Sequence, residues 1–321
     1  MNKHMQTHHR VFVAGQRGLA GSAVMRALRG RGYANLVTRS RAELNLLDRA
    51  AVFEFFGQQR PDHVFLAAAR VGGILANRDY PTEFLLENLT IQNNVIEAAH
   101  RFGVRKLMFL GSTCIYPRDC PQPIREEYLL SGHLETTNQA YALAKIAGLK
   151  LCAAYNRQHG TDFLCAMPTN LYGPGDNYDL QNSHVLPALL RKIHEARENN
   201  HSQVVVWGSG APLREFLHSD DLGEALVFLM QECSAEQVGE AINVGTGEDI
   251  SIRDLAQGIA KLVGFRGELV FDAEKPDGTP RKLLDVSRIQ ALGWRHRIAL
   301  EEGLRRTYSD YQQSLPAACA A

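Results

Sequence analysis

Near the start of the chain stands the stretch Arg10-Val11-Phe12-Val13-Ala14-Gly15-Gln16-Arg17-Gly18-Leu19-Ala20-Gly21. Its first half is a short apolar run that stops at a glycine, and this pattern predicts a buried strand. A helical pattern follows from about Gly18 to Arg29. The glycines between the two elements permit a tight turn and let a bound anion approach the backbone at the helix N-terminus. The stretch therefore predicts a strand, an anion-binding turn and a helix.

The same alternation continues along the first half of the chain. Further strands are predicted at 35–38, 63–69, 106–110 and 162–167, and further helices at 48–59, at 82–102 and around Tyr141. Strands that alternate with helices at this spacing indicate a parallel sheet covered on both faces. We therefore expect an α/β fold with a Rossmann-type, doubly wound parallel sheet.

The pattern changes after Pro168, where glycine, proline and asparagine cluster up to Ser183 and the apolar runs become shorter. Strands are predicted at 204–208 and 268–271, an amphipathic helix at 220–230, and a strand at 242–245 that could return to the first sheet. We expect a dinucleotide-binding domain of residues 10–178 with about 217–247. A smaller, discontinuous α/β substrate domain would comprise about 179–216 and 248–315.

Composition excludes several classes of protein. The 321 residues are 45% hydrophobic and 22% charged, with 35 basic and 35 acidic side chains. A zero formal net charge argues against a nucleic-acid or membrane-surface role. No apolar run approaches the roughly 20 residues of a membrane span, and the polar start MNKHMQTHHR shows no secretory signal. The six cysteines form no regular framework and no metal site is predicted, so we expect a cytoplasmic protein with reduced cysteines.

The residues around the second predicted strand indicate which dinucleotide the glycine turn binds. An acidic side chain there would accept a hydrogen bond from a ribose 2′-hydroxyl, whereas arginine accommodates a 2′-phosphate. Arg39 and Arg41 occupy that region and Arg17 lies in the glycine turn, which favours NADP(H) over NAD. Glu43 is the counter-evidence. Asp48 is placed either for the adenine amino group or as a helix N-cap.

The pair Tyr141 and Lys145 indicates proton-transfer chemistry. A spacing of four residues on a helix places both side chains on one face. A fixed ammonium group beside a phenol is expected to lower the pKa of the phenol from its usual value near 10. Such a tyrosine exchanges protons with a carbonyl or hydroxyl oxygen. Ser112, just past the strand at 106–110, stands where ligands bind in parallel sheets.

A strand-end Ser112 followed by Tyr141-x-x-x-Lys145, after an N-terminal glycine turn, resembles the short-chain dehydrogenase/reductase superfamily, and the length and second half suit its extended branch. A closer resemblance, from about residue 10 to 310, is to the family of GDP-L-fucose synthases, the GDP-4-keto-6-deoxy-D-mannose 3,5-epimerase/4-reductases. The segments that carry it are 71–74, 111–117, 167–174, 182–189, 207–210 and 275–282.

The resemblance implies residue roles. Tyr141 would protonate the C4 oxygen, Ser112 would hydrogen-bond it (Thr113 is the less favoured substitute) and Lys145 would hold the nicotinamide ribose. Cys114 would be the base and His184 the acid of the two epimerisations. The expected cofactor-binding residues are Gly15, Gln16, Arg17, Gly18, Leu19, Ala20, Gly21, Arg39, Arg41, Asn45, Leu46, Asp48, Leu110, Gly111, Ser112, Thr113, Lys145, Pro168, Thr169, Asn170, Leu171 and His184.

The GDP-sugar substrate would be held by the second domain, and the resemblance implies a homodimer formed through the helices at 82–102 and 139–158. The expected substrate-binding residues are Lys192, Trp207, Arg214, Asp277 and Lys282. The sequence leaves alternatives open. These are a related GDP-4-keto-dideoxyhexose epimerase/reductase of the GDP-colitose type, less favourably a nucleotide-sugar 4,6-dehydratase or 4-epimerase, and a non-catalytic NADP-binding regulator.

Overall fold

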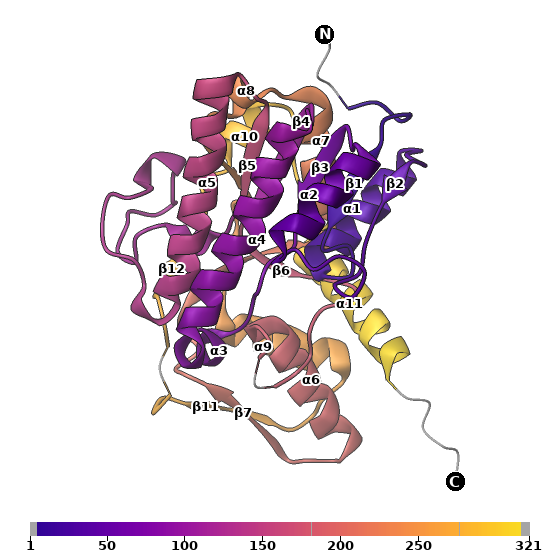
Figure 1. Cartoon of the computed structure of the whole chain (residues 1–321). Coiled ribbons are helices and arrows are strands. Elements are labelled where there is room, and N and C mark those ends of the chain that lie inside the picture. The colour runs from indigo at the N-terminus through magenta and orange to yellow at the C-terminus, as the bar shows by residue number, and fades with distance from the viewer. Residues whose placement is uncertain (1–4, 181, 276, 316–321) are drawn as a thin grey trace.

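Six parallel strands form the central sheet of the computed structural model, which describes residues 5–180, 182–275 and 277–315 (Figure 1). In spatial order they are β2 (Leu36–Val37), β1 (Val11–Ala14), β3 (His63–Leu66), β4 (Lys106–Leu110), β5 (Phe163–Pro168) and β9 (Ile242–Val244). The strand order reverses between β1 and β3, so their carboxyl ends flank the switch point at which such sheets bind ligands. The expected α/β fold is confirmed, and the strand at 242–245 does return to the first sheet.

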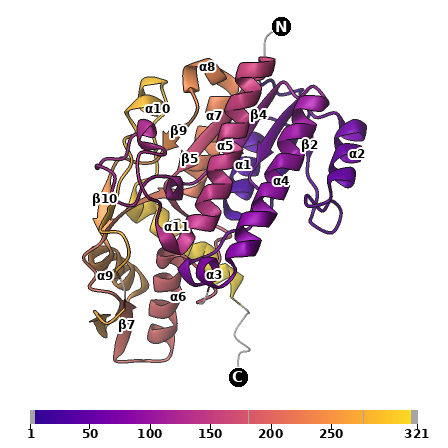
Figure 2. The same cartoon turned by 60° about the vertical axis from the view of Figure 1, so that its left-hand side comes forward.

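Helices cover both faces of the sheet. On one face α1 (Leu19–Gly30) packs against α7 (Ser219–Glu232). On the other, α4 (Pro81–Arg101) lies between α2 (Arg49–Gln59) and α5 (Gln139–His159), as Figure 2 shows. Asp48 caps α2 by accepting a hydrogen bond from Ala51 N at 3.1 Å, and Gly160 ends α5 in a left-handed conformation.

A smaller layer lies below the sheet in Figure 1 and has its own apolar core. It contains the parallel pair β7 (Gln203–Trp207) and β11 (Glu268–Asp272), with α6 (Val185–Glu198) and α9 (Ile252–Val263). The burial of β7 alternates strictly, as expected for a strand with one face on the core. Helix α11 (Leu300–Ser314) packs against α9 and β8 and closes this core.

A four-stranded sheet joins the two layers. It consists of β10 (Asp249–Ser251), β8 (Leu213–His218) and β12 (Arg281–Lys282), with β6 (Asn170–Tyr172) paired to β8. The remaining elements are short: α3 (Ile74–Asp79), α8 (Ala235–Val238), α10 (Ser287–Ala291), η1 (Thr113–Ile115), η2 (Glu126–Tyr128) and η3 (Thr136–Asn138). Helix α3 was not expected from the sequence, because six residues after two glycines give no clear helical period.

The division into two domains stays a prediction. Residues of the segment assigned to the substrate domain contribute to both cores: Leu255 and Ile259 are buried in the smaller core, and Leu284 and Trp294 in the larger one. The segment from Leu284 to Trp294 therefore packs back onto the dinucleotide-binding part, whereas α11 belongs to the smaller core.

Three further findings concern the cysteines, membrane-spanning helices and metal-binding groups of the described residues. Cys114, Cys120, Cys152, Cys165 and Cys233 are free thiols, while Cys319 lies outside the described residues. No helix in the described parts of the chain is long and apolar enough to cross a membrane. Among the same residues, no group of three or more His, Cys, Asp or Glu is placed to hold a metal ion.

Candidate active site

The glycine turn forms a cradle between β1 and α1. Gly15 has a φ of +88°, which L side chains rarely adopt, and a Cβ there would contact the backbone of Ala68. A Cβ on Gly21 would overlap the carbonyl group of Gly15. Helix α1 starts without a side-chain cap and without an acidic residue in its first turn. Its free N–H groups and positive dipole end therefore face the cradle, which fits a pyrophosphate.

The arginines expected to select the cofactor lie next to this cradle. Arg17 and Arg41 are exposed, and Arg39 packs over the Phe55 ring at 5.4 Å while donating to Thr38 O at 2.7 Å. Hydrogen bonds from Ser40, with smaller contributions from Arg39 and Arg17, lower the pKa of Glu43. Arg17 and Arg39 thus act on the same carboxylate, so their charges converge at the end of β2.

The neighbouring residues on this loop are held by one hydrogen bond within the loop and one from α4. Asn45 Oδ1 accepts from Leu47 N at 3.2 Å, and Leu46 O accepts from Asn94 Nδ2 of α4 at 2.9 Å. Asp48 is the N-cap of α2, the second of the two roles open to it from sequence. The capping bond uses one carboxylate oxygen and leaves the role at the adenine a prediction.

The ends of β4 and β5 carry the reacting groups. Leu110 O accepts a hydrogen bond from Lys145 Nζ at 2.7 Å, and a Cβ on Gly111 would overlap the side chain of Met167 in β5. Ser112 caps η1, where its Oγ accepts from Cys114 N at 3.3 Å. Thr113 is 4% exposed, so Ser112 is the better-placed hydroxyl of the two. The strand end thus brings Ser112 and Cys114 to the face where α5 presents Tyr141 and Lys145.

The expected lowering of the Tyr141 pKa is wrong for this structure. Burial raises the pKa of the Tyr141 phenol, and the negative form of Cys114 raises it further. Lys145 Nζ lies 5.6 Å from the centroid of the Tyr141 ring, and its ammonium group is turned to Leu110 O. Burial also lowers the pKa of Lys145 to about 8. Desolvation therefore outweighs the attraction that the i,i+4 spacing suggested.

Cys114 also differs from the expected poised thiolate. Burial raises the pKa of the Cys114 thiol, while Lys282, a hydrogen bond with Ser112 and Lys145 oppose that rise. The thiol is 7% exposed, and loss of hydration costs the anion more than two cations return. Lys282 on β12 is the cation that opposes the rise most.

His184 stands at the N-terminus of α6, at the side of the smaller layer. Burial lowers its pKa, and the Lys282 charge lowers it further, so the imidazole favours its neutral form. The residue is nevertheless reached by solvent, a combination expected of a group in an open, concave site. Because Cys114 and His184 both interact with Lys282, the structure brings the two expected proton-transfer residues close to one cation.

The loop expected to line the nicotinamide follows β5 directly. Thr169 N donates to Val244 O at 3.0 Å, and Asn170 Nδ2 donates to Glu215 O at 2.8 Å. Pro168 is the last residue of β5, and Leu171 lies in β6, which pairs with β8. These contacts fix the loop between the two sheets.

The expected substrate residues also gather in the joining sheet and the smaller layer. Lys192 Nζ lies 5.1 Å from the centroid of the Trp207 ring, whose side chain is 54% exposed. Asp277 accepts from Ser209 N and Ser209 Oγ, both at 2.7 Å, and thereby holds the turn after β7. Burial lowers the pKa of Arg214 while Asp277 opposes the change, and Arg214 in turn lowers the pKa of Lys282.

Glu215 is a residue of this region that the sequence did not single out. Its side chain is fully buried, accepts from Thr246 N at 2.6 Å and Gly247 N at 2.8 Å with one oxygen, and accepts from Leu284 N at 2.9 Å with the other. A carboxylate within the strand pattern 213–218 was the available signal, because buried carboxylates need partners. Glu215 positions β8 and β12, which carry Arg214 and Lys282.

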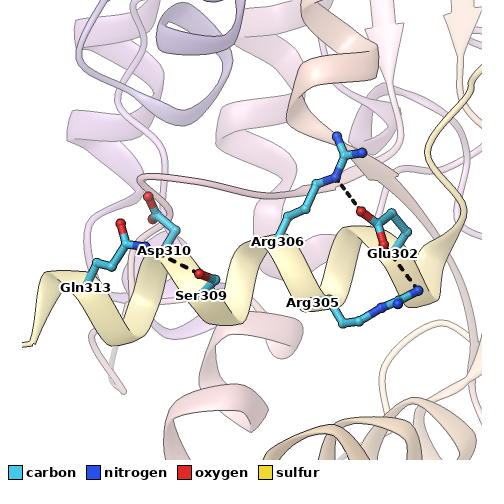
Figure 3. Close-up of a pocket in the computed structure, with 6 residues that line it drawn as sticks. All are labelled: Glu302, Arg305, Arg306, Ser309, Asp310 and Gln313. Carbon is cyan, nitrogen blue, oxygen red and sulfur yellow. Dashed lines mark hydrogen bonds and ion pairs between the residues drawn. The ribbon is translucent and has the colours of Figure 1, made fainter.

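A hollow of about 540 Å³ lies along α11, and its lining includes none of the site residues expected from the sequence (Figure 3). Its lining comes from α11, and Glu302 in it pairs with Arg305 and Arg306. Because these charges already neutralise one another, the hollow is a paired helix surface.

Comparison with known proteins shows the family to which the chain belongs. The model of the NAD dependent epimerase/dehydratase family matches residues 11–245. The chain belongs to this family. The chain is 57% identical over 305 residues to the GDP-L-fucose synthase of Escherichia coli (strain K12), covering 93% of this chain and 95% of the relative. It is 37% identical to the GDP-L-colitose synthase of Yersinia pseudotuberculosis, over 93% of this chain and 96% of that relative.

A solved structure of a similar protein contains a bound cofactor. A GDP-L-fucose synthetase from Naegleria fowleri bound to NADP superposes with a TM-score of 0.89 at 32% identity, and the match covers 97% of this chain and 94% of that one. The expected resemblance to the GDP-L-fucose synthases is confirmed by these relatives. As a member of the NAD dependent epimerase/dehydratase family, the chain is expected to use its cradle at Gly15 for a dinucleotide.

Proposed function

We propose that this chain catalyses the NADPH-dependent 3,5-epimerisation and 4-reduction of GDP-4-keto-6-deoxy-D-mannose to GDP-L-fucose. The observation that carries the proposal is that Ser112, Tyr141, Lys145 and Lys282 all interact with Cys114. The 57% identity to a GDP-L-fucose synthase supports this substrate over the colitose-type alternative, whose relative is 37% identical.

NADP(H) fits the residues at the switch point. The cradle of Gly15, Gly18 and Gly21 at the free N-terminus of α1 would hold the pyrophosphate, and Arg17 and Arg39 would hold the 2′-phosphate. When bound, NADPH supplies the hydride for the C4 carbonyl carbon. Lys145, whose ammonium group is already fixed at Leu110 O, would contact the nicotinamide ribose.

In the reduction, Tyr141 donates its proton to the C4 oxygen while Ser112 hydrogen-bonds the same oxygen. The raised pKa of Tyr141 favours the protonated phenol, which is the form that a proton donor needs. The upward direction of the pKa shift therefore supports the acid role.

In the epimerisations, Cys114 removes the proton next to the ketone and His184 returns a proton to the opposite face. Lys282 favours the thiolate of Cys114 but disfavours the imidazolium of His184. A diphosphate bound near Lys282 and Arg214 adds negative charge, which raises the pKa of His184 towards its ordinary range. Substrate binding thus favours the protonated form of His184, which is the form that acts as the acid.

The test separates the two half-reactions. Purified protein is incubated in D₂O with GDP-4-keto-6-deoxy-D-mannose and NADPH, and NADPH absorbance and deuterium at C3 and C5 are followed. Tyr141→Phe is expected to slow NADPH consumption by about 10²- to 10⁴-fold and keep deuterium uptake. Cys114→Ser is expected to lose deuterium uptake. Turnover by the wild type without deuterium at C3 and C5 would contradict the epimerase half.

We also propose that the protein is a cytoplasmic homodimer formed through α4 and α5. These two helices pack side by side, and they expose Leu86 (61%) and Leu143 (45%) on the surface, with Tyr80 (51%) at the start of α4. A second copy would cover these side chains in a four-helix contact. Light scattering is expected to give a dimer for the wild type and a monomer for Leu86→Lys/Leu143→Lys; a monomeric wild type would refute the proposal.

A further inference from the structure

Three buried polar atoms beside the candidate site have no hydrogen-bond partner among the described residues. They are Asn77 Oδ1, Asn138 Oδ1 and Ser183 Oγ. Leaving a buried polar atom unpaired costs about 1–3 kcal/mol, so each atom is expected to meet a partner in the working enzyme. None of the three residues was singled out from the sequence or used in the mechanism above.

Contacts between short segments bring the three residues to one place. Asn77 Nδ2 donates to Gly72 O at 2.9 Å and to Gly73 O at 3.0 Å, and Gly73 N donates to Asn182 O at 3.1 Å. A Cβ on Gly73 would stand 3.2 Å from Ser183 O. Helix α3, which carries Asn77, packs against η3, which ends at Asn138. The segments that carry the three atoms therefore lie side by side and form one polar region.

Two of the three residues stand close in sequence to the groups proposed to exchange protons with the substrate. Asn138 is the N-cap of α5 and stands three residues before Tyr141, so the two side chains share a helix face. Ser183 directly precedes His184. A ligand atom in this region would thus be a neighbour of the carbonyl group that Tyr141 protonates.

The three side chains indicate which kind of ligand group they would bind. The two carbonyls that accept from Asn77 Nδ2 fix the orientation of its amide, so its Oδ1 is an acceptor. Asn138 makes no side-chain capping bond to α5, although asparagine at this position ordinarily does. Two amide oxygens and a serine hydroxyl together suit a ligand that donates through O–H.

We propose that the C3 hydroxyl of the ketosugar, next to the reacting carbonyl, binds in this region, where it donates to Asn77 Oδ1 or Asn138 Oδ1 and accepts from Ser183 Oγ, and that this contact selects 3-hydroxy over 3-deoxy substrates. The inference rests on the proposed function for its sugar. A substrate that lacks this hydroxyl leaves the buried acceptors unpaired, which is how a polar site rejects an analogue that is smaller by one oxygen.

The experiment compares kcat/KM for GDP-4-keto-6-deoxy-D-mannose and for its 3-deoxy analogue. The wild type is expected to prefer the 3-hydroxy substrate. Asn138→Ala and Ser183→Ala are each expected to reduce this preference by about tenfold or more, through a loss on the 3-hydroxy substrate alone. Among the described residues, neither change removes a side-chain hydrogen bond to another side chain or to backbone. NADPH affinity and circular dichroism report that folding is intact.

Thr136→Ala is the matched control, because Thr136 is an exposed residue of the same short helix η3. It should leave the preference at the wild-type value. A preference that is unchanged in both Asn138→Ala and Ser183→Ala, or losses equal for the two substrates, would overturn the inference and indicate that the region holds only water. A wild type that consumes neither substrate would refute the proposed function, and this inference with it.

Discussion

Tyr141 and Lys145 lie one turn apart on α5, yet the lysine donates to Leu110 O and the phenol stays in a dehydrated environment. The same competition decides the state of Cys114, whose pKa burial raises against the opposing charge of Lys282. Charge-to-charge distance is thus the smaller influence on these groups, and the loss of water is the larger. Changes to single charges are therefore expected to move pH profiles without abolishing the site.

Lys282→Met tests this balance. Removing the ammonium group takes away the main influence that lowers the pKa of Cys114, so this pKa should rise. Because the base is the thiolate, which exists above its pKa, the rising limb of deuterium uptake at saturating substrate should move to higher pH by about 1 unit or more. The pH profile of C3 and C5 exchange, measured by mass spectrometry, reports the shift.

Lys192→Met is the control for this experiment. Lys192 lies against Trp207 and does not contribute to the pKa of Cys114. Its loss should raise KM and leave the pH profile in place. A Lys282→Met profile that coincides with that of the wild type would mean that Lys282 acts only in substrate binding.

At the scale of elements, the backbone of α1 lies unusually close to the backbone of the glycine turn after β1. Gly21 lies in the first turn of α1 directly against the Gly15 carbonyl, with no room for a Cβ. Gly30, the last residue of the same helix, has no heavy atom within 4 Å of the place that a Cβ would take. One helix therefore contains a glycine that the fold requires and one that it does not.

Gly21→Ala is expected to push α1 away from the turn and to weaken NADPH binding by at least about tenfold, because the N–H groups that face the phosphates would shift. Gly30→Ala should bind NADPH as the wild type does and gain up to about 1 kcal/mol of stability from helix propensity. Cofactor fluorescence titration and thermal melts of both variants measure these effects. Equal NADPH affinity in the two variants would show that the cradle is not the phosphate site.

At the scale of the whole molecule, Glu215 connects the two sheets. Its carboxylate binds the backbone of Thr246 and Gly247 after β9 and of Leu284 after β12. The strand end of the dinucleotide-binding part and the strands that carry Arg214 and Lys282 are therefore held by one buried side chain. Such a contact keeps cofactor and substrate in one geometry.

Glu215→Ala is expected to lower the free energy of unfolding by about 3–5 kcal/mol, since three buried N–H groups lose their acceptor. Glu248→Ala, which removes an exposed carboxylate two residues from Thr246, should change it by less than about 0.5 kcal/mol. Urea denaturation followed by circular dichroism compares the two. A loss below 1 kcal/mol in Glu215→Ala would refute the connecting role.

The stability of the whole chain should also fall in acid because of His63. This fully buried histidine in β3 contacts His9 Nδ1 at 2.9 Å, and burial lowers its pKa to about 3. An unfolded histidine titrates near 6.5, so between these values only the unfolded chain binds the proton and stability falls as pH falls. From pH 7 to 5 this amounts to about 2 kcal/mol.

His63→Gln removes the titrating group and keeps a polar partner for His9. Its urea midpoint should therefore change less between pH 7 and pH 5 than that of the wild type. If both proteins lose the same stability over this interval, His63 is not the group responsible.

Elements that depend on residues near in sequence were predicted, whereas elements that depend on distant partners were not. The strands at 106–110 and 162–167 and the helices at 82–102 and around Tyr141 appear where local periodicity predicted them. The short helix α3 and the joining sheet of β6, β8, β10 and β12 did not emerge from the sequence, because elements of two to six residues depend on distant partners. The same holds for Glu215, whose three partners lie 31, 32 and 69 residues away.

The sequence by itself determined the strand, glycine turn and helix at 10–21, the arginines that follow the second strand, and the residue types of the proton-transfer set. These depend on local spacing, which the order of residues specifies directly. Folding decides the direction in which the pKa values of Tyr141, Lys145 and Cys114 shift, and it brings Cys114 and His184 close to Lys282. The physical reason is that desolvation depends on everything packed around a group, and most of those neighbours are remote in the chain.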